Sequence, residues 1–345
     1  MKKQTSAMVV VALSLALVGC GTPQAQTSEQ AKPQEEAVVS TQAPDTQAET
    51  PAAEPADAKT DDAAKDKTEV KQKLDERSSA LAKAWEADLK KAAEDASTRV
   101  CIRAIDLESG ATAGVESDRQ MPSASMIKLI IAETLLKQAS AGKLSLDDAY
   151  ELDRADVVGG TGEIQGMAAG TKLDNRELLQ QMIVSSDNTA TNVIIKRVGM
   201  DAVNAEAKAL DLKATKLQRL MMDLDAAKEG RDNFTSADDL AKLLQMVYDG
   251  TFVDKQSSKL MLEILEQQKD NDCISKGLPE GTKFAHKTGS GTTVRHDGGI
   301  VEGEHPFVLV CLCGDDGRFS EQAAMEAMAN VGKVASADSN ASQAG

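Results

Sequence analysis

The stretch MPSASMIKLIIAETLL, residues 121–136, places Ser125 and Lys128 three positions apart at the head of an apolar run. At the start of a helix, residues i and i+3 share a face, so the lysine ammonium can approach the serine hydroxyl. Burying an ammonium is costly unless it is paired or gives up its proton. A lysine held partly neutral beside a hydroxyl is a proton acceptor next to a nucleophile. The stretch therefore predicts a helix over residues 125–140 that carries a nucleophilic Ser125 with Lys128 as its general base.

Two further short motifs follow along the chain, and each adds a group that acyl transfer needs. The motif SDN, residues 186–188, lies within or just after a helical segment, and KTGS, residues 287–290, ends a strand. The Ser186 hydroxyl can relay a proton to a leaving nitrogen, and the Asn188 amide can orient a substrate amide. Lys287, with the two hydroxyls that follow it, can hold a substrate carboxylate.

These three motifs in this order are the signature of class A β-lactamases and penicillin-binding proteins, and the sequence resembles that family over residues 76–335. The resemblance extends to a proline and small residues before Ser125, a GGTGEIQ stretch and a glycine pair after the third motif. It implies a serine hydrolase that forms an acyl-enzyme on Ser125 with β-lactams, with backbone N–H groups of Ser125 and Ser290 as the oxyanion hole. The resemblance implies the catalytic residues Ser125, Lys128 and Ser186, and the substrate-binding residues Asn188, Lys287, Thr288, Gly289 and Ser290.

One loop departs from the family pattern. Class A β-lactamases carry a loop glutamate, in a pattern like R-x-E-P-x-L-N, that activates the water which hydrolyses the acyl-enzyme. The corresponding stretch is RLMMDLD, residues 219–225, with Met221 at the glutamate position and Asp225 at the asparagine position. A thioether cannot accept a proton from water, so deacylation is expected to be slow. It would be faster only if Asp223, Asp225 or Glu229 supplied the base instead.

The order of the other segments predicts an α+β fold. A helical pattern begins near Leu74, with Leu81, Trp85 and Leu89 recurring every four residues. Two strands are expected around the turn at residues 109–110. Helices are then expected within residues 125–140, 176–199, 201–210 and 235–250, strands within 282–290, 292–303 and 305–315, and a last helix within 319–335. This order predicts an antiparallel five-stranded sheet flanked by the N- and C-terminal helices, with an inserted all-helical subdomain.

The N-terminus has the layout of a secretory signal peptide. Two lysines precede an apolar run over residues 7–18 that is short for a membrane span. The run ends in LVGC, which resembles the bacterial lipobox and predicts lipidation of Cys20. Residues 1–20 are thus expected to be a lipoprotein signal peptide, with the mature protein anchored on the extracytoplasmic face of the cell membrane. The alternative is an ordinary signal peptide that happens to contain a cysteine.

Composition indicates which segments lie outside the folded domain and which partners are disfavoured. Residues 21–75 are rich in Ala, Glu, Pro, Thr and Gln and are expected to be a disordered tether, and residues 336–345 a disordered tail. The formal net charge of −16 argues against sequence-independent binding to nucleic acid. No cofactor or metal is expected, and the protein is expected to be a monomer.

The cysteines and one histidine are expected to be structural. Cys273 and the pair Cys311 and Cys313 fit no zinc-ligand spacing. Buried free thiols are the favoured interpretation, although a bridge from Cys101 to Cys311 or Cys313 stays open. His286, adjacent to Lys287, alternates to the opposite strand face and is expected to pack. In the same way Asp187 is expected to cap a helix or form a turn.

Three functions are compatible with these residues. The first is a β-lactamase with unusual deacylation. The second is a D,D-peptidase that acts on the stem peptides of peptidoglycan. The third is a module that binds muropeptides or β-lactams without hydrolysing them. The presence of both Ser125 and Lys128 favours an enzyme, since a pure binding module needs neither.

Overall fold

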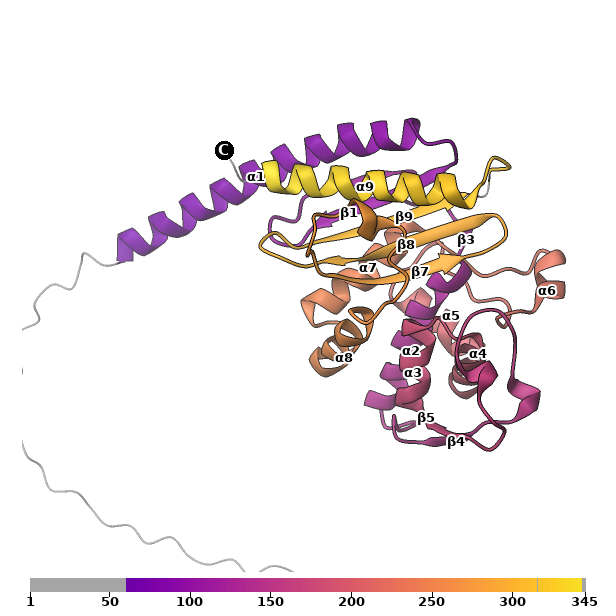
Figure 1. Cartoon of the computed structure of the whole chain (residues 1–345). Helices are drawn as coiled ribbons and strands as arrows, with labels where there is room; N and C mark the ends of the chain where they lie inside the picture. The colour runs from indigo at the N-terminus through magenta and orange to yellow at the C-terminus, as the bar shows by residue number, and fades with distance from the viewer. Residues whose placement is uncertain (1–59, 315, 343–345) are drawn as a thin grey trace, which may run out of the picture. The chain divides into compact units, whose positions relative to one another are not determined.

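The computed structural model describes residues 60–314 and 316–342, and the fold is built from these (Figure 1). The predicted signal peptide and Cys20 lie outside the described residues, as does most of the predicted tether. The helices are α1 (Thr60–Glu94), α2 (Lys128–Ser140), α3 (Asn175–Val184), α4 (Asn188–Val198), α5 (Met200–Ala209), α6 (Leu224–Lys228), α7 (Ala237–Asp249), α8 (Lys255–Leu265) and α9 (Glu321–Ala341). The strands are β1 (Val100–Asp106), β2 (Thr112–Val115), β3 (Met121–Pro122), β4 (Ala149–Glu151), β5 (Lys172–Asp174), β6 (Phe234–Thr235), β7 (Phe284–Ser290), β8 (Val294–Val301) and β9 (Phe307–Gly314).

A five-stranded antiparallel sheet carries the fold, in the order β2-β1-β9-β8-β7. The first two strands and the last three are the ones expected from the sequence, and the α+β fold class is confirmed. Strands β8 and β9 are buried along their whole length, which fits a sheet covered on both faces. Two short pairs, β3 with β6 and β4 with β5, lie outside this sheet and were not expected.

The helices α1 and α9 cover one face of the sheet (Figure 1). Leu81, Trp85 and Leu89 of α1 are fully buried there, at the four-residue spacing seen in the sequence. The Trp85 indole N–H donates to the carbonyl of Ala335 in α9 at 3.1 Å, so the largest side chain of the layer is also satisfied as a donor. Helices α1 and α9 lie far apart in the sequence but are joined by packing and by this hydrogen bond.

The helical part packs on the opposite face of the sheet. Helix α7 contacts β1, β8 and β9, and α2 packs between α4, α5 and α7. A capping box between Asp174 and Glu177 begins α3, because each side chain accepts from the backbone N–H of the other residue. The apolar residues of α2 to α8 and of this sheet face form one continuous core.

Several element boundaries differ from the expected ones. Helix α1 begins at Thr60, so residues 60–75 are helical and not part of the tether. Helix α9 continues to Ala341, so residues 336–341 are not a disordered tail. Composition does not mark either extension, because residues 60–75 are rich in Asp and Lys and residues 336–341 are Ser, Ala, Asp and Asn. The helical stretch 176–199 is also interrupted, at residues 185–187, by the SDN motif.

The four described cysteines are buried free thiols, as the favoured interpretation expects. Cys311 and Cys313 point to the α1–α9 side of the sheet, and their sulfur atoms lie 3.8 Å apart. Cys101 belongs to the core on the other side, because alternate residues of a strand face opposite ways. The sheet therefore separates Cys101 from both partners that the sequence left open for a bridge.

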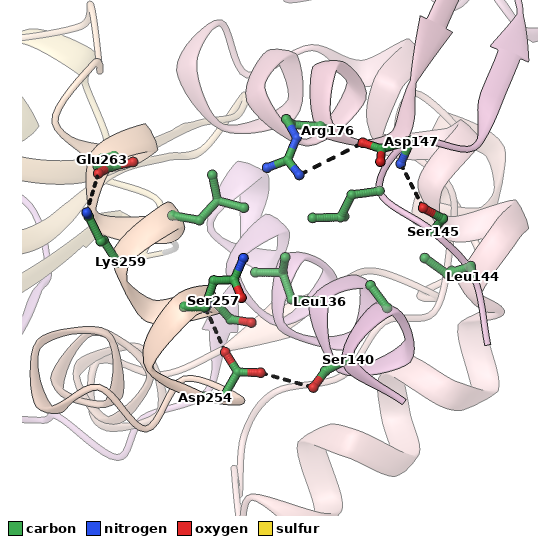
Figure 2. Close-up of a pocket in the computed structure, with 14 residues that line it drawn as sticks. Leu136, Ser140, Leu144, Ser145, Asp147, Arg176, Asp254, Ser257, Lys259 and Glu263 are labelled. Carbon is green, nitrogen blue, oxygen red and sulfur yellow. Dashed lines mark hydrogen bonds and ion pairs between the residues drawn. The ribbon is translucent and has the colours of Figure 1, made fainter. Parts of the chain in front are cut away.

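A hollow of about 660 Å³ lies in the helical part, between α2, α3 and α8 (Figure 2). Leu136 and Leu144 line it, and its rim carries exposed ion pairs such as Lys259 with Glu263. None of the three sequence motifs reaches this hollow. Among the described helices, none combines the length and the apolar character that crossing a bilayer requires.

Candidate active site

A second and larger cleft, of about 850 Å³, lies where the β7 edge of the sheet meets the helical part. Five of the eight site residues expected from the sequence line it, namely Ser125, Ser186, Asn188, Thr288 and Ser290. The structure thus brings together three motifs that are separated by as many as 160 positions in the chain.

Ser125 lies in a short 3-10 turn, η1 (Ala124–Ile127), that leads directly into α2. A 3-10 turn has three residues per turn, so Ser125 and Lys128 lie on the same side of it. Ala124 has a φ of +43°, a left-handed backbone conformation that is costly for a residue with a Cβ. The Ser125 side chain belongs to a residue that is only 8 % exposed, and that exposure is to the cleft.

Lys128 is fully buried, and its amine contacts the SDN motif. Nζ donates to the carbonyl of Ser186 at 2.7 Å and lies 3.0 Å from Ser186 Oγ and 3.0 Å from Asn188 Oδ1. These contacts fix the end of the Lys128 side chain against the SDN motif. The burial of Lys128 agrees with the apolar run after Ser125, whereas the close approach of its amine to the Ser125 hydroxyl stays a prediction.

The hydroxyl of Ser186 joins the two lysines of the site. Lys287 Nζ lies 3.1 Å from Ser186 Oγ, on which Lys128 Nζ also converges, and it donates to the carbonyl of Thr288 at 2.6 Å. Lys287 is fully buried as well. A hydroxyl can donate and accept at once, so Ser186 is placed to pass a proton between either amine and a group in the cleft.

Both lysines have lowered pKa values. Burial lowers the pKa of Lys128 well below its ordinary value, and the positive charge of Lys287 lowers it further, against an opposing effect of Asp187. Burial also lowers the pKa of Lys287, to about 7, although the carboxylates of Asp270 and Asp297 oppose this. Both shifts favour the neutral amine over the ammonium, which is the direction that a proton acceptor requires.

Helix capping fixes the SDN motif. Asp187 caps α4, where it accepts from the N–H of Ala190, and it also accepts from the N–H of Ile164 at 2.8 Å. This confirms the structural role expected for Asp187. Ser186 itself has a φ of +53°, and its carbonyl also accepts from the Thr161 hydroxyl at 2.7 Å. The capping contacts hold Ser186 in a backbone conformation that it would rarely adopt alone.

Gly289 lets strand β7 approach the nucleophile. A Cβ at this position would lie 3.1 Å from Cγ of Met126 and 3.4 Å from Cβ of Ala124, so a larger residue would require the Met126 side chain to shift by a few tenths of an ångström. Gly289 does not itself line the cleft. Its contribution is to place Thr288 and Ser290, on either side of it, against the turn that carries Ser125.

The loop at residues 219–225, which corresponds to the glutamate loop of the family, also lines the cleft. Met221 is 8 % exposed and lines the wall, and the side chain of Asn192 makes two hydrogen bonds to its backbone. Arg219 Nε and Asp232 Oδ1, 2.8 Å apart, close the loop at its base. The residue that follows Arg219 by two positions therefore does face the cleft, and it is a methionine.

The acidic side chains proposed as substitutes are engaged elsewhere. Asp223 caps α6, where it accepts from the N–H of Ala226. Asp225 pairs with Lys228 at 3.0 Å, and Glu229 pairs with the neighbouring Arg231. None of these three carboxylates lines the cleft. Asp232 does line the cleft, but it is paired with Arg219. The described loop thus presents no unpaired carboxylate to the cleft in place of the glutamate.

Sequence reasoning missed an ion pair at the end of the cleft, between Asp270 and Arg295. The only signal was an arginine within a predicted strand, next to His296 and Asp297. His286 is buried as expected, but it also bonds the carboxylate of Asp297 at 2.8 Å. His296 is buried with its pKa lowered to about 4 by burial, and its Nε2 lies 2.8 Å from the carbonyl of Pro122. Both histidines brace the sheet behind the cleft.

Within residues 60–314 and 316–342, no group of three His, Cys, Asp or Glu side chains is placed to hold a metal ion. The cleft brings together the hydroxyl of Ser125, the bridging hydroxyl of Ser186 and the buried amines that contact it.

The chain is similar in sequence and in fold to known proteins. A family model described as the Beta-lactamase enzyme family matches residues 84–338, which include every site residue named above. Beta-lactamase L2 of Stenotrophomonas maltophilia is 28 % identical over 245 residues, which is 69 % of this chain and 80 % of the relative. Beta-lactamase 3 of Bacillus cereus is 27 % identical over 221 residues, 62 % of this chain and 69 % of the relative.

Solved structures agree with these relatives. The β-lactamase of Sphaerobacter thermophilus superposes with a TM-score of 0.69 at 27 % identity, covering 74 % of this chain and 97 % of that one. A structure of PBP-A, at 24 % identity and a TM-score of 0.67, covers 74 % of this chain and 95 % of its own and supports the fold alone. The chain belongs to the β-lactamase enzyme family, as a serine hydrolase of the class A, penicillin-recognising type.

Proposed function

We propose that β-lactams acylate this enzyme at Ser125 and that the acyl-enzyme is hydrolysed slowly. One observation carries this proposal: Ser186 Oγ lies within 3.1 Å of both Lys128 Nζ and Lys287 Nζ, in the cleft that Ser125 lines. Curated relatives named β-lactamases support the substrate class.

Acylation follows from the protonation states of the site. The neutral amine of Lys128 takes the proton of the Ser125 hydroxyl as Oγ attacks the lactam carbonyl. The C–N bond of the ring then breaks, and Ser186 delivers a proton to the leaving nitrogen while Lys128 returns its own to Ser186. The products are an ester on Ser125 and a ring-opened amine. The backbone N–H groups of Ser125 and Ser290 are proposed as the oxyanion hole, and Asn188, Thr288 and Ser290 as substrate contacts.

The described site lacks the carboxylate that activates water for deacylation in class A β-lactamases. Hydrolysis of the ester needs a base within hydrogen-bond reach of a water molecule, and Met221 supplies a thioether where that base would lie. General-base assistance typically contributes about 10²–10⁴-fold, so hydrolysis of the ester should be the slow step by that order.

A D,D-peptidase acting on peptidoglycan stem peptides is the second candidate, and Met221 is the observation that favours it. The acylation chemistry is the same for a peptide amide as for a lactam. A long-lived β-lactam ester defeats the purpose of a β-lactamase, whereas in a peptidase, whose substrate is a peptide, it would only be inhibition by a substrate mimic. A module that binds without reacting is disfavoured by the buried Lys128 beside Ser125.

We also propose that the protein is exported, lipidated at Cys20 and held as a monomer on the extracytoplasmic face of the cell membrane. The lysines, apolar run and LVGC sequence at the N-terminus support this.

Intact-mass spectrometry tests the proposed function. The purified protein is incubated with benzylpenicillin, and the Ser125→Ala variant serves as control. The expected result is one adduct per wild-type chain and none on the variant. An adduct that persists on Ser125→Ala would mean that another residue is the nucleophile. Following the loss of a fluorescent penicillin label over time then gives the rate of deacylation.

A further inference from the structure

The GGTG sequence, residues 159–162, packs against the SDN motif of the active site, and its Thr161 lines the cleft. The backbone N–H of Asn188 donates to the carbonyl of Thr161 at 3.1 Å. The side-chain amide of Asn188 donates to the carbonyl of Gly159, also at 3.1 Å. One residue of the motif therefore holds the loop backbone at two points, and these fix the place of Thr161.

Glycines on both sides of Thr161 permit this close approach. A Cβ on Gly160 would lie 2.6 Å from Nδ2 of Asn188, and a Cβ on Gly162 would lie 2.1 Å from Oδ2 of Asp187. The two glycines have φ values of +87° and +118°, which residues with a Cβ rarely adopt. The loop thus brings the Thr161 side chain to the SDN motif at a place where its two neighbours carry none.

Thr161 meets the buried lysine of the site at the carbonyl of Ser186. The Thr161 hydroxyl donates to this oxygen at 2.7 Å, and Nζ of Lys128 donates to the same oxygen at 2.7 Å. A carbonyl oxygen has two lone pairs, so the two donors occupy both. Ser186 has a φ of +53°, and the bond from Thr161 helps to hold it in that conformation, with its Oγ between the two lysines.

The same carbonyl acts on the protonation of Lys128. An ammonium gains more from a carbonyl acceptor than a neutral amine does, so this oxygen favours the charged form. Two charged groups also act on the pKa of Lys128: Lys287 of β7 lowers it, and Asp187 of the SDN motif raises it. Because Thr161 shares the electron density of the carbonyl, it weakens the support that the oxygen gives to the ammonium.

We propose that Thr161 is a positioning residue for acylation: its hydroxyl holds the Ser186 carbonyl and thereby sets Lys128 and Ser186 for proton transfer. The proposal rests on the proposed function, because it takes Lys128 as the base and Ser186 as the proton relay. Thr161 acts through Ser186 and takes up no proton itself.

Thr161→Val tests the proposal, because valine keeps the shape of threonine and lacks the donor. Thr161 is exposed at the cleft, and the added methyl keeps water from replacing the hydroxyl. Time-resolved intact-mass spectrometry with benzylpenicillin gives the rate of adduct formation across a pH series. At neutral pH the rate should fall about three- to tenfold, the size expected for one lost hydrogen bond. The acid limb of the pH–rate profile should move to higher pH, because Lys128 then holds a proton more tightly.

Thr161→Ser restores the hydroxyl and should restore both the rate and the profile. Thr171→Val is the matched control: the Thr171 hydroxyl also donates to a carbonyl at 2.7 Å, that of Ala168, but Thr171 does not line the cleft. This control should leave the rate and the profile unchanged. A purely structural role of Thr161 would lower the fraction of enzyme that reacts without moving the acid limb.

Heteronuclear NMR of the lysine Cε–H groups follows the titration of Lys128 without requiring any reaction, with Lys128→Ala to assign the signal. In Thr161→Val the signal should titrate at higher pH than in the wild type. A titration that does not move, an adduct rate that Thr161→Val leaves unchanged, or an equal change in Thr171→Val would overturn the proposal. A moved titration with no adduct on the wild type would overturn the proposed acylation alone and leave the coupling of Thr161 to Lys128 in place.

Discussion

The side chain of Asn192 brackets the backbone of Met221. The N–H of Met221 donates to Oδ1 of Asn192 at 2.8 Å, and Nδ2 of Asn192 donates to the carbonyl of Met221 at 3.1 Å. Asn192 lies on α4 and is buried, so this clamp is anchored in the core of the helical part. Because the clamp uses only backbone atoms of residue 221, it should hold that position whichever side chain is present there.

The wild-type enzyme should show a burst followed by slow turnover. With a chromogenic cephalosporin in excess, we expect one equivalent of product per enzyme to form rapidly, because acylation uses Ser125 and Lys128, which are intact. A slow steady state should follow, because the thioether of Met221 cannot activate water and the loop carboxylate that does line the cleft, Asp232, is paired with Arg219. Stopped-flow absorbance measures both phases. Fast turnover without a burst would show that another group already activates water.

Installing a carboxylate should accelerate the slow phase. Met221→Glu, held by the Asn192 clamp, should raise the deacylation rate by up to about 10²-fold, the lower end of what a general base contributes. Met221→Gln is the control, since it has the same size and no base, and should leave the rate unchanged. Equal rates for both variants would contradict the assignment of this loop position, provided that a pH series shows the new glutamate to be ionised.

Lys128 should be required as an amine that can lose its proton. Lys128→Ala and Lys128→Arg should both slow adduct formation by about 10²–10⁴-fold, because a guanidinium keeps its proton at every accessible pH. Time-resolved intact-mass spectrometry measures the rate. If Lys128→Arg reacted at the wild-type rate, a positive charge alone would suffice and the base would have to be another group.

Burial of Lys287 should destabilise the folded protein. Its pKa is about 7 in the fold, below its ordinary value, so the unfolded chain binds more protons than the native state between about pH 7 and pH 10. Lys287→Met should therefore raise the free energy of unfolding, on the order of 2 kcal/mol after the lost hydrogen bonds are subtracted. The gain should be full at pH 7 and below and should shrink as the pH rises toward 10.

Urea unfolding of wild type and variant at pH 7 and pH 9.5 measures this effect. Lys283→Met, an exposed lysine next to the same strand, is the control and should give no gain. A loss of stability in Lys287→Met at pH 7, with the control unaffected, would mean that the hydrogen bonds of Lys287 outweigh its burial cost.

Membrane attachment should depend on Cys20. Cys20→Ala should move the protein from the membrane fraction to the soluble fraction, because the lipid attached to that thiol is the proposed anchor. Ser125→Ala, which leaves the LVGC sequence intact, should stay in the membrane fraction. Equal fractionation of the two variants on immunoblots would count against lipidation.

The strands and the motifs could be predicted from the sequence because each has a local signal. Apolar residues mark β1 and β9, short turn-bounded stretches mark β7 and β8, and SxxK, SDN and KTG mark the cleft. The start of α1 at Thr60 could not be predicted from burial, because the residues before Val70 belong to a tether-like composition. The pairing of Asp270 with Arg295 depends on a register between distant segments, which no local pattern encodes.

The burial of four thiols on two sides of the sheet has a practical consequence for how this domain matures. No covalent cross-link joins its layers, so folding of the described residues does not wait for an oxidant. Yield from a reducing cytosol and from an oxidising compartment should be the same. The sulfhydryl groups also become probes of opening: an alkylating reagent can reach them only when the layers separate, so the rate of their modification reports how often the native enzyme unfolds.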